Sequence, residues 1–316
     1  MDHTAASESC EDVIRTVRKA VVCERPFLET VLAGLLSRGH VLLEDTPGTG
    51  KTLTARSIAT ALGVSFSRIQ FTPDLLPSDV TGTHIFNEET REFEFNEGPL
   101  FANVVLADEI NRAPPKTQSA LLEAMEEGQV SVGSETYELP EPFFLIATQN
   151  PIEYEGTFPL PEAQIDRFLM KTSIGYPSFE GEKTLLQRRA TRHERSPTVA
   201  SVLSADLVHE LQTAPESVRV DDDVLEYMLR ITRGTRSDRR IDVGVSPRGT
   251  QRLFEVARSQ AVLEGRDYVT PDTVRSVATA ALAHRLVLTP DARVEQLEKP
   301  AILEEIVSEV EVPTIG

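Results

Sequence analysis

Residues 41–52 carry the strongest chemical pattern in the chain, because an apolar run leads into a glycine-rich turn and then into Lys51 and Thr52. In such a turn, glycines let backbone N–H groups converge on an anion, and the N-terminus of a following helix adds partial positive charge. The lysine reaches the phosphates, and the threonine hydroxyl is a ligand for Mg²⁺. The pattern therefore predicts a phosphate-binding loop made of Asp45, Thr46, Pro47, Gly48, Thr49, Gly50, Lys51 and Thr52.

The loop departs from the general pattern G-x-x-x-x-G-K-[ST] at one position, where Asp45 stands in place of the first glycine. Gly48 and Gly50, the positions nearest the phosphates, are retained. Taken alone, the segment has a second interpretation, a strand–turn–helix junction without a ligand.

Two adjacent acids, Asp108 and Glu109, end a second apolar run at residues 104–107. In an enzyme with a phosphate-binding loop, the first acid at such a strand end holds Mg²⁺ through water. The second polarises the attacking water as a general base. Because Asp-Glu pairs are common, this interpretation depends on the loop that precedes it.

Asn150 follows a third apolar run at residues 143–147. Ligands of open α/β sheets bind at the carboxyl ends of the strands, where an asparagine could orient the lytic water. The alternative is an asparagine that begins a turn before Pro151.

Composition limits the class of protein. The chain has 316 residues, 40% of them hydrophobic, and a net charge of −18. This charge argues against extensive electrostatic binding to the phosphates of nucleic acid, because such binding depends on Lys and Arg. We find no apolar run of the roughly 18 residues that a membrane span requires. The polar, acidic N-terminus is unlike a signal peptide, so we expect a cytoplasmic protein. The acidic, lysine-poor composition also favours a salt-rich cytoplasm as a hypothesis.

The first part of the chain predicts alternating strands and helices. Residues 1–10 are expected to form a loose tail, and residues 11–37 two amphipathic helices. Strands are expected at 41–44 and 64–71 besides the two apolar runs above, and His40 is expected to bond to backbone where the first strand begins. A helix is expected at 114–128 and a short one at 161–168. Alternating patterns around polar turns predict β-hairpins at 85–95 and 129–139.

The rest of the chain has helical periodicity, which predicts two domains, 1–177 and 178–316, the second all-α. Ser204, Ser246 and Thr270 stand at helix N-cap positions. Arg248 falls in the first turn of a helix, where a cation opposes the helix dipole, so we expect an anion close to it. Helices are expected at 180–194, 205–212, 222–232, 247–264 and 271–283.

Several strings together resemble the MoxR family of AAA+ ATPases, and the resemblance extends from about residue 13 to the C-terminus. The Asp45 departure also occurs within that family. The segment Val22-Cys23-Glu24 lacks the Gly-Gln pair expected on the adenine side. The strings are residues 43–52, FTPDLLPSD at 71–79, LADEINRAPPKTQ at 106–118, ATQNP at 147–151, GTFPLPEAQIDRF at 156–168 and SPR at 246–248.

The resemblance implies an α/β fold, with an αβα P-loop AAA+ core, a parallel sheet of strand order 5-1-4-3-2 and a helical lid. The two hairpins would be the helix-2 and pre-sensor-1 inserts. Asp108 and Glu109 would be the Walker B acids and Asn150 sensor 1. Arg167 would be the arginine finger that reaches a neighbouring subunit, and Arg248 would be sensor 2. For Arg167 the alternative is an ion pair with Asp166.

The implied function is ATP hydrolysis with Mg²⁺ in a hexameric ring. Family members are similar to chaperones that remodel protein partners, among them proteins with von Willebrand factor A domains. Two other classes stay open. The hairpins are shared with DNA-dependent helicase-like motors, although the acidic charge makes nucleic acid an unlikely partner. The third class is a nucleotide-gated scaffold with little hydrolysis.

Overall fold

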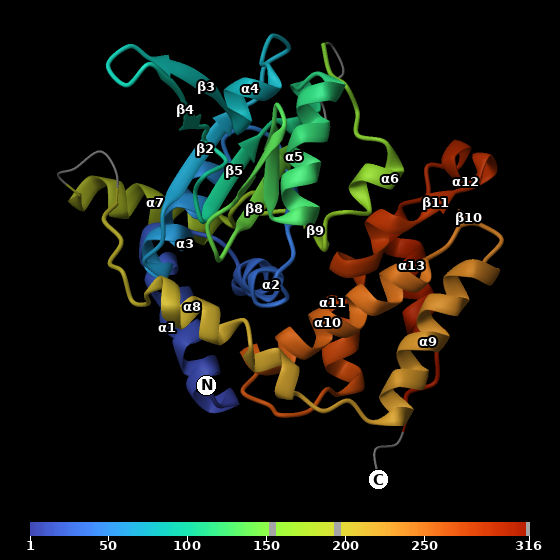
Figure 1. The fold of residues 1–316 in the computed structure, drawn as a ribbon. Coiled ribbons are helices and arrows are strands. Elements are labelled where there is room, and N and C mark those ends of the chain that lie inside the picture. Colours follow the sequence, from blue (N-terminus) through green and yellow to red (C-terminus); the bar gives the residue numbers. More distant parts are fainter. Residues whose placement is uncertain (152–155, 193–196, 314–316) are drawn as a thin grey trace.

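The computed structural model describes residues 1–151, 156–192 and 197–313, and its centre is a five-stranded parallel sheet (Figure 1). The strand order is β2-β5-β8-β1-β9. If only the strands of this sheet are numbered along the chain, the order is 2-3-4-1-5. Read from the other side, this is 5-1-4-3-2, which confirms the predicted order. The strands are β1 (Val41–Glu44), β2 (Phe66–Gln70), β5 (Val104–Asp108), β8 (Phe144–Gln149) and β9 (Met170–Thr172).

Both faces of the sheet are covered, as the αβα prediction requires. Alternate residues of a strand point to opposite faces. Thus Val41 and Leu43 join one buried cluster, whereas Leu42 joins the other. The first cluster contains α1 (His3–Ala20), α2 (Arg25–Leu36) and α3 (Lys51–Leu62); the second contains α4 (Pro77–Thr81), the 3₁₀ turn η1 (Ile110–Arg112) and α5 (Pro115–Glu127).

Both predicted hairpins are present, and they touch each other. Phe95 of one stacks on Tyr137 of the other with ring centroids 3.9 Å apart. The hairpins are β3 (Gly82–Asn87) with β4 (Glu92–Glu97), and β6 (Gln129–Val132) with β7 (Glu135–Glu138). The short predicted helix is α6 (Glu162–Ile165).

The C-terminal part is helical, as predicted, with one addition. Ser204, Ser246 and Thr270 each cap a helix through the side-chain oxygen. A small antiparallel sheet pairs β10 (Ile241–Val243) with β11 (Val287–Leu288). These strands are too short to show an alternating pattern, so the all-α expectation missed them. The helices are α7 (Phe179–Thr191), α8 (Ala205–Leu211), η2 (Ala214–Ser217), α9 (Asp222–Ser237), α10 (Pro247–Leu263), α11 (Pro271–Leu282), η3 (Ala283–Arg285), α12 (Pro290–Val294) and α13 (Lys299–Glu309). The predicted end of the first of these helices, at residue 194, lies outside the described residues.

The expected loose tail at residues 1–10 is wrong, because α1 begins at His3. The Asp2 side chain caps the helix by accepting a bond from the N–H of Ala5 at 2.8 Å. Ala6 and Cys10 are buried, and they continue the apolar stripe of the helix toward its N-terminus. The sequence pattern concealed this stripe because polar residues separate its small members.

α10 packs against both α1 and α2, so the N-terminal and C-terminal parts share one hydrophobic cluster (Figure 1). The boundary at residue 177 stays a prediction. In the described part of the chain, no helix has the length and apolar character to cross a membrane.

His40, directly before β1, ties three elements together. Its Nε2–H donates to the carbonyl of Met125 at 2.9 Å, and its Nδ1 accepts from the N–H of Leu145 at 3.0 Å. This confirms the expected backbone bond. Burial lowers the pKa of His40 to about 4, from an ordinary value of 6.5. Because Nδ1 accepts a bond, the native state requires the neutral ring.

We predict that His40 makes the fold sensitive to mild acid. Below pH 6.5 the unfolded chain takes up a proton on this ring while the native chain does not, so stability is lost as the pH falls toward 4. The loss from this group approaches about 3 kcal/mol. Urea unfolding at pH 7 and pH 4.5 measures it. His40→Gln has no titrating ring and is expected to lose less stability between those two pH values; an equal loss would contradict the assignment.

Candidate functional site

The predicted loop connects the end of β1 to the start of α3. Gly48 and Gly50 adopt φ angles of 89° and 91°, in the left-handed region that glycine tolerates best. A Cβ at either position would meet nothing within 4 Å. The two glycines are therefore required by the backbone conformation, and open space lies beside them. α3 begins at Lys51, directly after Gly50, and no side chain of a described residue caps it, so the first N–H groups of the helix are available to a ligand.

Lys51 is buried beneath the loop and holds its first half in place. Its Nζ donates to the carbonyl of Asp45 at 2.9 Å and to that of Thr46 at 3.3 Å. The ammonium group thus lies against the loop, at the place where the sequence predicts that phosphate binds.

Asp45 has a structural partner that the sequence did not reveal. Its buried carboxylate accepts from the N–H of Ile174 at 2.6 Å and from that of Gly175 at 3.0 Å. The hydroxyl of Thr46 donates to that of Tyr176 at 3.0 Å. The residue that replaces the first glycine therefore fastens the loop to residues 174–176, the connection between β9 and α7. Its carboxylate therefore bonds to this connection, and no bond to it from Gly48 or Gly50 is seen in the described part of the chain.

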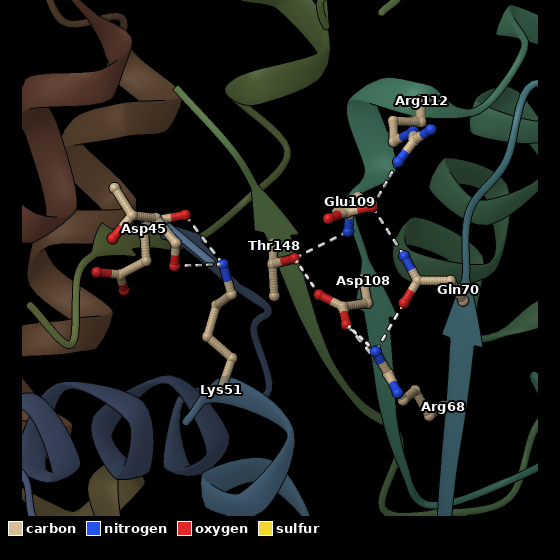
Figure 2. Close-up of polar contacts among 9 residues, drawn as sticks. Asp45, Lys51, Arg68, Gln70, Asp108, Glu109, Arg112 and Thr148 are labelled. Atoms are coloured by element: carbon tan, nitrogen blue, oxygen red, sulfur yellow. Dashed lines mark hydrogen bonds and ion pairs between the residues drawn. The ribbon is translucent and has the colours of Figure 1, made fainter. Parts of the chain in front are cut away.

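Asp108 lies at the end of β5, held from two sides (Figure 2). Its Oδ1 accepts from the Thr148 hydroxyl at 2.7 Å. Its Oδ2 accepts from Arg68 Nη2 at 2.6 Å. Arg68 Nε also donates to Oδ2, at 3.2 Å. These three bonds leave acceptor capacity on Oδ1, since an ionised carboxylate offers about four lone-pair sites. Arg68 and Thr148 were not among the predicted site residues, because their place depends on strand pairing.

Glu109 adopts a left-handed backbone, with φ of 61°. Such a conformation is uncommon for residues other than glycine and occurs often at functional sites. Gln70 Nε2 donates to the Glu109 carboxylate at 2.8 Å, and Arg112 Nη1 does so at 3.2 Å. The Glu109 N–H donates to the Thr148 hydroxyl at 2.8 Å. The carboxylate is thus held by two donors beside Asp108.

Asn150 is buried and directly follows β8. Because β8 lies between β5 and β1, its end stands between the acids and the loop. Figure 2 shows Thr148 in this middle place, with Lys51 on one side and Asp108 on the other. The structure therefore brings the loop, Asp108, Glu109 and Asn150 to one edge of the sheet.

Arg167 and Arg248 lie elsewhere. Both contact the carboxylate of Glu126, at 3.4 Å and 2.8 Å. Asp166, the alternative partner of Arg167, is paired with Arg285. Glu126 supplies the anion expected beside Arg248, but the sequence did not single it out.

This arginine pair belongs to the opposite edge of the sheet. Glu126 is next to Met125, which His40 contacts directly before β1 begins. The loop follows the other end of β1. Five residues of extended chain separate His40 from Asp45, about 16 Å at the usual rise per residue. Neither arginine therefore lies beside its own loop.

Two hollows flank α3 and share Leu53 and Pro197 in their linings. One, of about 290 Å³, is lined by Thr52. The other, of about 600 Å³, lies between α1, α3 and α7 and carries the cations Lys19, Arg188, Arg189 and Arg192. The larger volume lies within the range that is typical of small-molecule sites. Space and positive charge thus continue from Thr52 along α3.

Comparison with known proteins agrees with this geometry. The family described as "ATPase family associated with various cellular activities (AAA)" matches residues 40–170, and the AAA lid domain matches residues 233–306. A presumed ATPase from Cytophaga hutchinsonii has a crystal structure that superposes with a TM-score of 0.91 at 38% identity, covering 99% of this chain and 97% of that one. The fold and the matched families define an AAA+ ATPase.

The curated relatives are more specific. The chain is 42% identical to "Chaperone MoxR1" of Mycobacterium tuberculosis, covering 99% of this chain and 84% of that protein. It is 34% identical to "Protein MoxR" of Paracoccus denitrificans, with 96% of each covered. It is 49% identical to YeaC of Bacillus subtilis, whose function is not characterised, over 95% of this chain and 93% of that one. The chain belongs to the MoxR family.

We predict that Thr148 supports the acids at the end of β5. Thr148→Val keeps the shape but leaves the Glu109 N–H and Asp108 Oδ1 without this partner. Leaving such buried groups unpaired lowers the free energy of unfolding by about 1–3 kcal/mol. Urea unfolding measures the loss. Thr148→Ser keeps the hydroxyl and is expected to retain most of the stability; equal losses in both variants would show that the methyl group, and not the bonds, matters.

Proposed function

We propose that this chain binds ATP with Mg²⁺ and hydrolyses it at the carboxyl edge of its sheet. The observation that carries the proposal is the convergence there of the loop 45–52, Asp108, Glu109 and Asn150. Thr46, Pro47, Gly48, Thr49, Gly50 and Lys51 would hold the phosphates, whereas Asp45 would contribute its backbone. Thr52 and Asp108 would hold Mg²⁺.

The residues fit these groups. Open space beside Gly48 and Gly50 matches a phosphate cradle at a helix N-terminus. Bound Mg²⁺ would neutralise charge that develops on the phosphates. Glu109 would accept the proton of the attacking water, and Asn150 would orient that water. Gln70 and Arg112 fix the Glu109 carboxylate until then.

Assembly would supply the arginines that a single chain does not bring to its own phosphates. Arg167 and Arg248 share Glu126 at the far edge of the sheet, so in a single chain neither neutralises its own phosphates. We infer that both serve the loop of a neighbouring copy in a ring, with six subunits as the expected number. Arg248 then acts in trans, as Arg167 does.

The work driven by hydrolysis is proposed from family membership. One relative is named a chaperone, which supports remodelling of protein partners, with von Willebrand factor A-domain proteins as candidates. A DNA-dependent motor has less support, because the net charge is −18. A nucleotide-gated scaffold would bind ATP but show little or no turnover, so a measurement of ATPase activity distinguishes it.

We predict that steady-state ATPase activity per subunit rises cooperatively with protein concentration, because each site needs a neighbour's arginines. Glu109→Gln is expected to bind ATP and to lose turnover, since the amide cannot accept the proton. Phosphate release measured across a dilution series checks both. Turnover that is independent of concentration, or undiminished in the variant, would contradict the proposal; no turnover at any concentration would favour the scaffold.

We predict that Arg167→Ala keeps ATP affinity and loses about 10³–10⁵-fold in turnover, the usual effect of an arginine finger. Affinity is measured with a fluorescent ATP analogue and turnover by phosphate release, at a concentration where the ring is assembled. Arg219→Ala, which removes an exposed arginine paired with Asp267, is the matched control. Unchanged turnover in assembled Arg167→Ala would exclude the role.

A further inference from the structure

Arg285, the last residue of η3, is a buried cation with no part in the chemistry proposed above. Its side chain is 2% exposed. It follows α11 in the C-terminal helical part, yet its contacts reach across to the core. One side of the guanidinium meets the turn between α6 and β9, which carries Arg167.

Arg285 contacts the residues directly before and after Arg167 in the sequence. Nη2 donates to the carbonyl of Phe168 at 3.0 Å and to that of Asp166 at 3.3 Å. Nε lies 3.1 Å from the Asp166 carboxylate in an ion pair. His284, its neighbour, also contacts the Phe168 carbonyl through Nε2, at 3.1 Å. Two consecutive residues of the lid, His284 and Arg285, therefore contact the backbone of the Asp166–Phe168 turn.

The same side chain touches the element that carries Arg248. A Cβ added at Gly249 would lie 2.7 Å from Val245 Cγ1, 3.0 Å from Arg285 Cδ and 3.4 Å from Arg285 Nε. The first turn of α10 therefore packs directly on the stem of Arg285, and glycine is the residue that allows this approach. Arg285 thus lies between the two segments whose arginines meet at Glu126.

The guanidinium remains charged in this setting. Burial lowers the pKa of Arg285 to about 10, while the Asp166 carboxylate acts in the opposite direction. At neutral pH a buried cation therefore stands beside the turn. A buried charge is tolerated only when it is paired and hydrogen-bonded. Arg285 meets this condition through the Asp166 carboxylate and the carbonyls of Asp166, Phe168 and Ala281.

We propose that Arg285 is a positioning residue: it fixes the Asp166–Phe168 turn and the first turn of α10 against each other, and so sets where Arg167 and Arg248 project. This inference rests on the proposed function, in which the two arginines serve the neighbouring copy. It implies that η3 of one subunit sets the turnover of the next subunit's site without touching nucleotide.

Arg285→Met tests the proposal, because it keeps the length and apolar stem but removes every donor. We expect ATP affinity close to wild type and turnover about 100-fold lower, the usual effect of misplacing a catalytic group by about 1 Å. Arg219→Met, the same replacement at an exposed ion pair, is expected to leave both unchanged. Loss of ATP affinity in Arg285→Met, or full turnover, would overturn the proposal.

Mixed rings separate this role from a general effect on the fold. Arg285→Met subunits keep Glu109, and Glu109→Gln subunits keep well-placed arginines. Mixing the two proteins is therefore expected to raise turnover above that of either variant alone. The reference is the mixture of Arg167→Ala with Glu109→Gln. Recovery in the reference alone would overturn the role of Arg285 and leave the proposed function standing. Recovery in neither would overturn the trans arrangement itself.

A readout independent of activity is hydrogen exchange at residues 166–170. Arg285→Met is expected to speed exchange there, with the amides of β1 unchanged; equal exchange at residues 166–170 would overturn the proposal. Should Arg285→Met fail to fold, Gly249→Ala decides by the same mixing and exchange measurements. Its added Cβ would lie 2.7 Å from Val245 Cγ1 and 3.0 Å from Arg285 Cδ, so the first turn of α10 must shift relative to Arg285. The same recovery in mixed rings and the same faster exchange are therefore expected, and their absence would overturn the proposal.

Discussion

The pairing of β1 on both sides, with β8 and with β9, is the constraint on which the rest of the structure depends. Parallel strands gather their carboxyl ends at one edge, so this pairing places the loop after β1 next to Thr148 and one strand away from Asp108. It also places residues 174–175, just after β9, within reach of the Asp45 carboxylate. The predicted phosphate loop is therefore tied to both neighbours of β1, to the end of β8 through the Asp45 N–H and to the segment after β9 through the Asp45 carboxylate.

The two ends of β1 have different functions. Its carboxyl end carries the loop, and its amino end, through His40, carries the C-terminus of α5 and hence Glu126. A parallel sheet cannot bring these ends together within one chain. Under the proposed function, the phosphates at the loop and the arginines Arg167 and Arg248 lie at opposite ends of β1, so a second copy would be needed to bring them together. The separation within the fold is thus the physical reason to expect that turnover depends on assembly.

Local patterns predicted much of this fold, because the loop, the buried runs ending in Asp108 and Asn150, and the N-caps are each encoded within a few residues. Partners distant in the chain could not be predicted in this way. The Asp45 carboxylate bonds to an amide 129 positions away, and Arg248 reaches Glu126 across 122. Arg68, Thr148 and Arg285 gain their importance only through such pairings. The helix at residues 3–10 was missed for another reason: its buried face is made of small residues.

Arg285 illustrates why a buried cation can be kept where an apolar side chain would pack. Replacing a buried ion pair by apolar groups is often neutral or stabilising, so Arg285 and Asp166 are weak evidence for stability. An apolar side chain, however, has no preferred direction toward the carbonyls of Asp166 and Phe168. The planar guanidinium donates along fixed directions, so the turn that carries Arg167 is held in one orientation. In the proposed ring, a fixed orientation of this turn would place Arg167 toward the neighbouring subunit, a role that an apolar side chain at position 285 would not fulfil.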